Sequence, residues 1–341
     1  MHALLDQPET LGTFLAEHGQ PPFRERQIWR WMFQRRAGDF QTMTDLPATL
    51  RDALAARFDI FGNRVLDHQR DDDGTEKLLL AMADGEQVEC VLLRDEQQHR
   101  TACISTQVGC AMGCAFCATG LDGLRRNLTR GEILGQLLRL AQRLPVEERL
   151  THIVVMGMGE PLANLDALLP ALQAASNSEG LGIGVRRITV STVGLPAGIR
   201  RLAELDSPYH LAVSLHAADD ELRNRLVPIN RTTGVAAVIE ATDDYFHATG
   251  RRVTFEYVLL GGLNDQPHHA RRLADRLAGR PVMVNLIPLN PVPGLPYRAP
   301  SATDVRRFTE LLERGGLNVQ LRHRRGVSID AACGQLRAKN R

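Results

Sequence analysis

Hydrophobic residues recur at helical spacing in the first part of the chain. The segment Phe23–Phe33 places apolar side chains three and four positions apart, and residues 50–58 repeat the pattern. We therefore predict a small helical domain over residues 1–60. Trp29, Trp31 and Phe33 belong to the first of these helices. Such aromatic groups form either a surface on which nucleic-acid bases stack or, more often, the core of a helical bundle, so we assign them to the core.

The pattern changes over residues 61–99, where two apolar runs stand on either side of a turn signal. The runs are Lys77–Met82 and Gln87–Leu93, and Asp84-Gly85 lies between them. An Asp-Gly pair between apolar runs is typical of a β-hairpin, because both residues tolerate the left-handed backbone of a tight turn. We predict that residues 61–99 form a β-hairpin extension that connects the helical domain to the rest of the chain.

Strand-like and helix-like segments alternate over residues 100–341. Helical periodicity covers residues 129–143 and 165–175, and Thr129 with Glu132 fits a capping box at the start of the first. Because strands that alternate with helices run parallel, the pattern predicts an α/β domain with a parallel sheet, open or closed into a barrel. The predicted strands are residues 101–106, 152–156, 187–191, 210–215, 253–259, 282–287 and 319–321.

Composition and charge indicate where the protein resides but do not identify a partner. No apolar run approaches the roughly 18 to 20 residues that span a bilayer. The first 20 residues lack the cationic flank and apolar stretch of a secretory signal, so we expect a cytoplasmic protein. The net charge is only +1, but residues 314–341 hold seven basic residues and one acid. That excess could grip phosphates or simply be a solvated end of the chain.

Three of the six cysteines crowd into one loop, Gly109–Gly120, with the spacing C-x3-C-x2-C. In a cytosolic protein such a group indicates a metal or redox site. Three thiolates can hold a 4Fe–4S cluster and leave one iron open for a ligand such as S-adenosylmethionine (SAM). A zinc site with Cys103 or Cys333 as fourth ligand is the alternative. The loop follows a strand, where parallel sheets bind their ligands, which favours the cluster. The proposed ligands are Cys110, Cys114 and Cys117.

Further polar residues stand near the ends of predicted strands. The segment Met156–Leu162 reads Met-Gly-Met-Gly-Glu-Pro-Leu, and the carboxylate of Glu160 is suited to pair with a cationic amino group. Individually, such residues usually cap helices or form turns. Together they would line one rim of the predicted barrel and form a ligand site. The others of this kind are Ser191, Ser214, His216 and Asn290.

These motifs resemble known families. The cysteine spacing, with Phe116 before the last cysteine, and the Gly-Glu-Pro loop resemble the radical-SAM superfamily. From Phe23 to the Asp-Ala-Ala-Cys-Gly-Gln-Leu motif that ends at Leu336, the chain resembles the RlmN and Cfr family of RNA methyltransferases. The resemblance implies a partial (β/α)6-type barrel, a helical domain that aids RNA binding, and SAM as both cofactor and methyl donor, two per turnover. It also implies 23S rRNA and tRNA as substrates and an electron donor such as flavodoxin or ferredoxin.

The resemblance also implies roles for single residues. Cys333 becomes the methyl-carrying cysteine, Cys103 the thiol that forms a disulfide with it, and Glu89 the proton acceptor. Taken alone, Cys103 would be a small buried hydrophobe, and Cys90 is assigned to the core. Ser328 stands where the family usually has Asp, so we expect the loop that carries Cys333 to be held differently, which affects fine substrate choice more than the chemistry. The implied SAM contacts are Gly159, Glu160, Ser191, Ser214, Leu215, His216 and Asn290.

Two cysteines and a cluster suit methylation of an adenine carbon. C2 of adenine has no lone pair with which to attack the sulfonium of SAM, whereas a thiolate has one. By resemblance, Cys333 is methylated, a radical from a second SAM activates that methyl, and Cys103 resolves the protein–RNA adduct. Three alternatives stay open: methylation at C8, as in the Cfr branch; a radical-SAM enzyme with another substrate; and a non-enzymatic RNA-binding protein with a structural metal centre.

Overall fold

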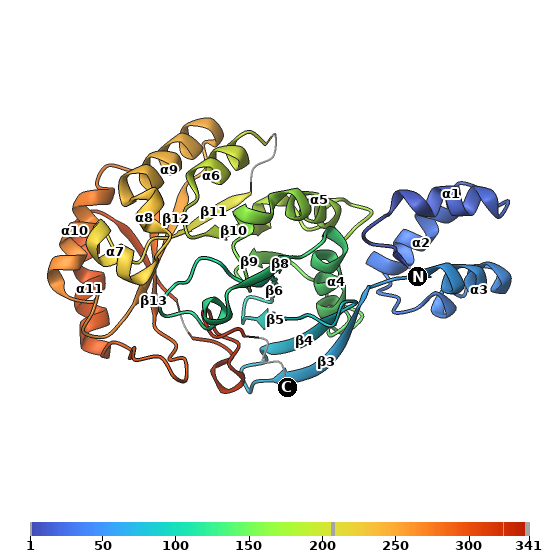
Figure 1. Ribbon diagram of the computed structural model, residues 1–341, viewed down its shortest axis with the longest axis horizontal. Helices are drawn as coiled ribbons and strands as arrows, with labels where there is room; N and C mark the ends of the chain where they lie inside the picture. Colours follow the sequence, from blue (N-terminus) through green and yellow to red (C-terminus); the bar gives the residue numbers. More distant parts are fainter. Residues whose placement is uncertain (1, 206–208, 323, 338–341) are drawn as a thin grey trace.

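The computed structural model describes residues 2–205, 209–322 and 324–337. The first helices form a lobe that protrudes at one end of the molecule (Figure 1). The lobe contacts the rest of the chain at the start of helix α4 (Arg130–Ala141), where Asp6 accepts a hydrogen bond from Gly131 N at 2.7 Å. Its elements are β1 (His2–Ala3), α1 (Glu9–Glu17), α2 (Phe23–Phe33), the 3-10 helix η1 (Phe40–Thr42), α3 (Ala48–Arg57) and β2 (Phe58–Asp59).

Helix α2 has the predicted bounds and buries the predicted kind of face. Ile28 and Met32 are fully buried, and Phe33 is 8% exposed. Trp29 and Trp31 are half-buried and pack against this core. The indole nitrogen of Trp31 also donates to Asp45 Oδ1 at 2.5 Å. The aromatic group therefore belongs mainly to the core of the lobe.

A ten-stranded mixed sheet runs through the remainder of the described chain, in the order β14-β13-β12-β11-β10-β9-β6-β5-β4-β3. A separate two-stranded antiparallel sheet pairs β7 (Gln107–Gly109) with β8 (Leu124–Asn127). Within the ten-stranded sheet, the strands from β6 to β14 pair in parallel, as predicted. β14 adds a seventh parallel strand to the six expected of a (β/α)6-type barrel. The strands are β3 (Asn63–Arg70), β4 (Glu76–Met82), β5 (Gln87–Arg94), β6 (Arg100–Cys103), β9 (His152–Val155), β10 (Ile188–Thr192), β11 (His210–Ser214), β12 (Val253–Leu259), β13 (Val282–Pro288) and β14 (Asn318–Leu321).

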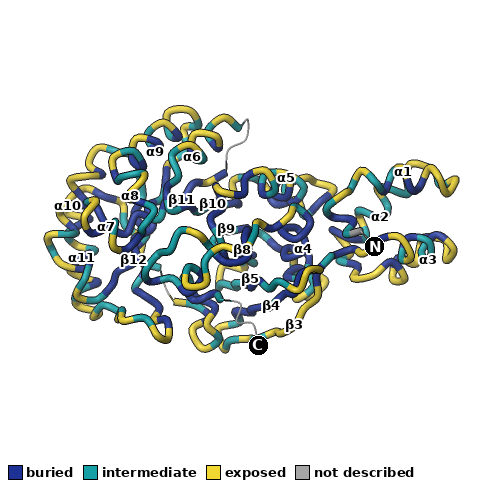
Figure 2. Tube along the Cα trace, in the orientation of Figure 1, coloured by how far each residue is buried: buried dark blue, intermediate teal, exposed yellow. Residues whose placement is uncertain are grey.

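The predicted hairpin is present, and one further strand joins it. β4 and β5 pair antiparallel, with Leu79 opposite Glu89. β3 lies on the outer side of β4 and was not predicted. Most of its residues are exposed (Figure 2), so it lacks the apolar alternation that identifies a half-buried strand.

Helices cover the outer side of the sheet (Figure 1). Thr129 and Glu132 form the predicted capping box at the start of α4. Among the described residues, no helix has both the length and the apolarity needed to cross a membrane. The helices are α4 (Arg130–Ala141), α5 (Leu165–Ser176), α6 (Pro196–Ala203), α7 (Asp220–Leu226), α8 (Asn230–Thr233), α9 (Val235–Thr249), α10 (Pro267–Leu277) and α11 (Ala302–Arg314).

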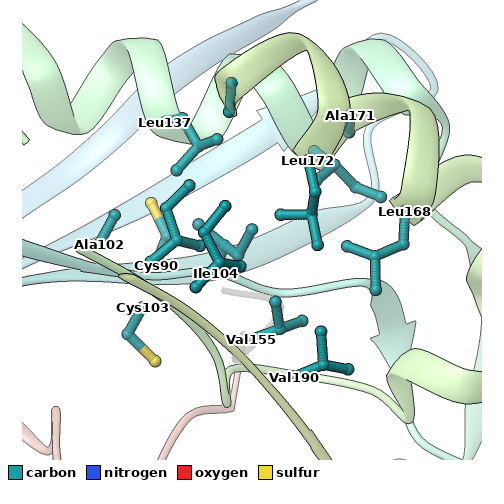
Figure 3. Packing of buried hydrophobic residues seen from close by; sticks show 14 of the residues in the cluster. Cys90, Ala102, Cys103, Ile104, Leu137, Val155, Leu168, Ala171, Leu172 and Val190 are labelled. Atoms are coloured by element: carbon teal, nitrogen blue, oxygen red, sulfur yellow. The ribbon is translucent and has the colours of Figure 1, made fainter. Parts of the chain in front are cut away.

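The apolar core lies between these helices and the sheet. Figure 3 shows Val155 and Val190 of neighbouring strands packed against Leu168 and Leu172 of α5. The strand residues that alternate with Val155 and Val190 face the other way, into the barrel, because side chains alternate across a sheet. The polar side chains that the sequence placed near strand ends are therefore free to form a site inside the barrel.

Candidate active site

The three clustered cysteines lie on a loop between β7 (Gln107–Gly109) and the 3-10 helix η2 (Ala118–Asp122). Gly109 has a φ of +74°, and a Cβ there would lie 1.9 Å from the carbonyl oxygen of Gly123, so only glycine fits this turn. The backbone of Ala115 donates to Leu226 O at 2.9 Å, and that of Ala118 donates to Gly334 O at 2.7 Å. The loop is therefore fixed both to α7 and to the C-terminal segment that carries Cys333.

One cavity of about 150 Å³ unites most of the predicted site. We call it the cluster cavity. Leu215 is an exception, because it does not line this cavity and its side chain is fully buried in the apolar core. Arg322, one of the basic residues near Cys333 in the sequence, also lines the cavity, as does Glu256, which sequence analysis did not single out. The predicted residues that line it are Cys110, Cys114, Cys117, Gly159, Glu160, Ser191, Ser214, His216, Asn290 and Cys333.

The three cysteine side chains suit a multi-iron cluster better than a single ion. Burial raises the pKa of the Cys110 thiol to about 11 and also raises the pKa values of Cys114 and Cys117. Iron binding would therefore displace protons from neutral thiols. Within the described residues, no three His, Cys, Asp or Glu side chains converge on one possible ion position. A zinc ion needs such convergence, whereas a cluster offers each thiolate its own iron.

Arg223 is a buried cation whose hydrogen bonds hold the backbone beside the cluster cavity. It is fully buried, and its guanidinium donates to the carbonyl oxygens of Leu215 at 3.0 Å and Ser214 at 3.1 Å, as well as to Val193 O. Burial lowers its pKa to about 10, and the nearby Cys114 opposes that shift. Arg223 thus joins the ends of two strands and places positive charge near the cysteine loop. No sequence motif distinguishes it from the other arginines.

The Gly-Glu-Pro loop packs tightly against the cysteine-bearing segment. Gly159 has a φ of +100°, and a Cβ there would lie 2.5 Å from the Cβ of Gln107. Glu160 is 2% exposed, and its carboxylate accepts backbone hydrogen bonds from Leu162 at 3.0 Å and Val193 at 2.9 Å. Burial raises the pKa of Glu160, and these hydrogen bonds oppose the shift. The carboxylate is thus held rigidly in the cavity wall.

His216 and Asn290 present polar atoms that a ligand can use. His216 has a φ of +60°, which is uncommon outside glycine, and its Nδ1 accepts a hydrogen bond from Val258 N at 3.0 Å. Burial lowers its pKa to about 3, so the ring is neutral and Nε2 carries the proton. Asn290 Oδ1 is buried and has no hydrogen-bond partner among the described residues. A buried acceptor of this kind is costly to leave unpaired, so the cavity fits a ligand that brings an N–H or O–H donor, as SAM does.

Cys103 and Cys333 meet in a second cavity of about 390 Å³, which we call the thiol cavity. Figure 3 shows the Cys90 sulfur on the side of the sheet that holds Leu137, and the Cys103 sulfur on the opposite side. Cys333 lines both the thiol cavity and the cluster cavity, whereas Cys103 lines only the thiol cavity. The structure therefore brings together the two cysteines that sequence analysis paired.

Arg322 lies near both Cys103 and Cys333. It lines both cavities, and the Cys333 thiol is the main influence that raises its pKa. Burial raises the pKa of Cys103 to about 12, the neighbouring Cys333 adds to the shift, and the Arg322 guanidinium opposes it. Cys103 is therefore a neutral thiol in this structure. Glu256, 4% exposed on β12, is a second buried charge near Arg322.

Glu89 lies apart from the two thiols. It is 6% exposed on β5, where Lys77 Nζ lies 3.0 Å from Oε1 and Arg337 N donates to Oε2 at 2.8 Å. It lines a third cavity, of about 730 Å³, whose walls do not include Cys333 or Cys103. Burial raises the pKa of its carboxyl group, and Lys77 opposes the shift.

Ser328, at the departure from the family pattern, forms a contact that an Asp could not make. Its hydroxyl and its backbone N–H both donate to Asp71 Oδ2, at 2.6 and 2.9 Å. Gly326 N donates to Asp73 Oδ2 at 2.9 Å. The turn between β3 and β4 therefore holds the Cys333 loop, which begins near the 3-10 helix η5 (Val327–Ile329).

Two family models match the chain. A model described as the radical SAM superfamily matches residues 104–274, about half of the chain. A model described as the ribosomal RNA large subunit methyltransferase N-terminal domain matches residues 4–60. The first covers the cysteine loop and the Gly-Glu-Pro loop, and the second covers the helical lobe.

Curated relatives and one solved structure extend the likeness to nearly the whole chain. A Rhodopirellula baltica protein named probable dual-specificity RNA methyltransferase RlmN is 59% identical over 98% of this chain and 90% of its own length. The protein of the same name from Symbiobacterium thermophilum is 47% identical over 96% of this chain and 89% of its own. A crystal structure of a radical SAM methyltransferase from Sphaerobacter thermophilus matches with a TM-score of 0.95 at 46% identity, covering 99% of this chain and 100% of that one.

Proposed function

The chain belongs to the RlmN family within the radical SAM superfamily, and on that premise we propose that it methylates C2 of an adenine in RNA. Its cofactors are a 4Fe–4S cluster and SAM. The observation that carries the proposal is the position of Cys333, which lines both the cluster cavity and the thiol cavity. A sulfur in that position can receive a methyl group on one side and be released by a second thiol on the other.

We assign the cofactor contacts by the walls of the cluster cavity. Cys110, Cys114 and Cys117 would hold the cluster, and Glu160 would accept a charge-assisted hydrogen bond from the amino group of SAM. Asn290 Oδ1 and the N–H of neutral His216 offer one acceptor and one donor. When bound, the two cofactors supply one-electron reduction, hydrogen-atom abstraction and the methyl group itself. The remaining contacts would come from Gly159, Ser191, Ser214 and the backbone of Leu215.

Cys333 is the nucleophile in this proposal. The sulfonium of SAM transfers its methyl group only to an electron pair, which the ring carbon does not offer and a thiolate does. Arg322 lines both cavities together with Cys333, so a positive charge faces the sulfur that would take the methyl group. The methylated sulfur then forms a carbon bridge to the adenine ring.

Cys103 resolves that bridge. Glu89 is assigned as the base that removes the ring proton, and the unpaired electron that the radical addition leaves would pass to the bound cluster, as the one-electron carrier. The Cys103 sulfur gives its proton to solvent and attacks the Cys333 sulfur, an S–S bond forms, the bond from the Cys333 sulfur to the bridging carbon breaks, and the carbon keeps the electron pair. A proton from solvent then completes the methyl group. Glu89 lines a cavity together with Asp330 and Gln335, which flank Cys333 in the sequence, and Arg337 N donates to Glu89, so the segment that carries Cys333 lies against β5.

The names of the relatives support RNA as the substrate class. Those relatives are named dual-specificity RNA methyltransferases, and we propose 23S rRNA and tRNA as the two substrates, in the cytoplasm. Residues 1–60 would be the accessory RNA-binding domain, 61–99 its connecting β-hairpin extension, and 100–341 the catalytic barrel. A low-potential carrier such as flavodoxin or ferredoxin would supply the electrons.

Mass spectrometry of digested RNA tests the proposal directly. Protein reconstituted anaerobically with iron and sulfide is incubated with a reductant, deuteromethyl-labelled SAM, and either unmodified 23S rRNA or unmodified tRNA. We expect labelled 2-methyladenosine from both RNAs. Labelled 8-methyladenosine would assign the chain to the other branch. SAM cleavage with no labelled nucleoside from either RNA would contradict the RNA substrate.

A further inference from the structure

The thiol cavity and the cluster cavity lie next to each other inside the barrel. They divide β9 and β10 between them, whereas at the end of β13 both reach Ile287 and Asn290. On β9 the thiol cavity contacts His152–Val154, and the cluster cavity continues from Val155 to the Gly-Glu-Pro loop. On β10 the same division falls between Thr189 and Ser191. The two cavities meet at a shared wall. That wall consists of Met156, Ile287, Asn290, Arg322 and Cys333.

The thiol cavity leads from solvent to a buried sulfur. Its outer residues, which include Arg187, Gln320 and Arg324, are exposed. Its inner end is formed by Cys103, which is 7% exposed, and by Cys333. Cys103 lines none of the other cavities described above. Among the cavities described here, the thiol cavity is therefore the one that leads to Cys103.

Positive charge dominates this passage. Arg94 is neutralised by Glu76 at 2.6 Å, and Asp95, the acid in the lining, is paired with His99 at 2.7 Å. The remaining cations form no ion pair with a carboxylate among the residues that the structure describes. Arg322 still lies near Glu256, and Arg325 lies near Asp95, so Arg187 and Arg324 are the least compensated. Cations around a narrow passage concentrate anions there. These cations are Arg187, Arg322, Arg324 and Arg325.

We propose that the thiol cavity binds a small anionic thiol that reduces the disulfide between Cys103 and Cys333. The proposal rests on the proposed function, in which each turnover leaves that disulfide and a reductant must restore both thiols before the next. A cavity of about 390 Å³ admits a small molecule but not the folded active site of a redox protein.

The reduction balances with two molecules of the thiol. The thiolate of the first attacks the Cys103 sulfur, the S–S bond breaks, and the electron pair leaves on Cys333 beside Arg322. A second thiolate attacks the sulfur of the small thiol in the mixed disulfide and frees Cys103. The small thiol is oxidised to its own disulfide, and the two protein sulfurs take up protons from solvent. Arg322 stabilises the leaving thiolate because its guanidinium lines the cavity next to Cys333.

Two thiols of equal length and opposite charge test the proposal. The full-length chain is oxidised chemically, and the Cys103–Cys333 disulfide is located by peptide mass spectrometry. It is then reduced with 2-mercaptoethanesulfonate or with 2-aminoethanethiol, and each rate is divided by that thiol's rate on a small soluble disulfide. Because the disulfide is made without SAM or RNA, the result does not depend on whether the chain methylates RNA.

We expect the normalised rate to be about tenfold higher or more for the anionic thiol. Arg187→Gln, which removes an exposed cation at the mouth, should bring the two rates closer together, and adding Arg324→Gln should bring them closer still. Arg306→Gln, an exposed arginine of α11 outside the cavity, should keep the wild-type ratio. Equal rates for both thiols, a ratio insensitive to Arg187, faster reduction by thioredoxin than by either small thiol, or failure of the two cysteines to form a disulfide would each overturn the proposal.

Discussion

The hydroxyl of Ser328 donates a hydrogen bond to Asp71 Oδ2 at 2.6 Å, and this contact ties the Cys333 loop to the turn between β3 and β4. The Ser328 backbone N–H donates to the same oxygen. An aspartate at position 328 would face the Asp71 carboxylate and repel it. This chain has therefore exchanged a charged side chain for a neutral donor, and the turn holds the loop as a result.

We predict that Asp71→Asn slows methylation severalfold while leaving the affinity for SAM unchanged. The substitution removes the charge that makes both hydrogen bonds from Ser328 strong, so the loop should leave its position more often. Alkylation of Cys333 by iodoacetamide should then become faster in the variant. Asp72→Asn in the same turn is the control, because Asp72 is exposed and outside this contact. If Asp72→Asn has the same effect, the turn as a whole rather than this contact holds the loop.

His216 should make the stability of the protein depend on pH. Its pKa is lowered to about 3 in the folded chain, against 6.5 for the free group. The unfolded chain therefore binds the extra proton between these values, so the stabilisation is complete above pH 6.5 and is lost as the pH falls toward 3. From about pH 7.5 to pH 5 the loss is about 2 kcal/mol.

Urea unfolding at the two pH values measures that loss. His216→Asn removes the titrating ring, keeps a possible acceptor for Val258 N and tolerates the positive φ. The free energy of unfolding of the variant should fall about 2 kcal/mol less than that of the wild type over this range. The same decrease in both proteins would show that His216 is already protonated at pH 7.5 or titrates without penalty.

Glu160 should contribute charge to SAM binding. Glu160→Gln keeps an oxygen that can accept the hydrogen bond from Leu162 N, so the loop should survive, but it removes the negative charge. We expect SAM to bind more weakly by on the order of 1.5–3 kcal/mol. Isothermal titration with the reconstituted protein measures the change, and the melting temperature checks the fold. Unchanged affinity in a folded variant would leave the carboxylate with only its capping role.

The cysteine loop should bind iron rather than zinc. Anaerobically reconstituted protein should contain about four irons per chain. Cys110→Ala, Cys114→Ala or Cys117→Ala should remove the cluster and the cleavage of SAM. Cys90→Ala, a change to a buried core cysteine, should preserve both. One zinc per chain with no iron would contradict the radical chemistry.

The sequence predicted those parts of the molecule in which local pattern decides the structure. Helix α2 and the capping box of α4 follow from periodicity and a cap at one position, and the cysteine loop from ligand spacing. Strand β3 was not predicted because its exposed residues have no apolar alternation. Arg223 and Glu256 were not predicted because the burial of a charged side chain depends on strands far away in the sequence. The separation of Glu89 from Cys333 depends likewise on tertiary packing, which no motif reports.

The central claim is that Cys333 carries the methyl group and Cys103 releases it. The most direct measurement is the intact mass of Cys103→Ala purified from cells that contain its RNA, before and after nuclease treatment. The account predicts that this variant carries RNA attached through Cys333, as a mass shift that nuclease reduces. Cys333→Ala and the double variant should carry none. A Cys103→Ala protein that turns over normally and is free of RNA, or an adduct in Cys333→Ala, would contradict the account.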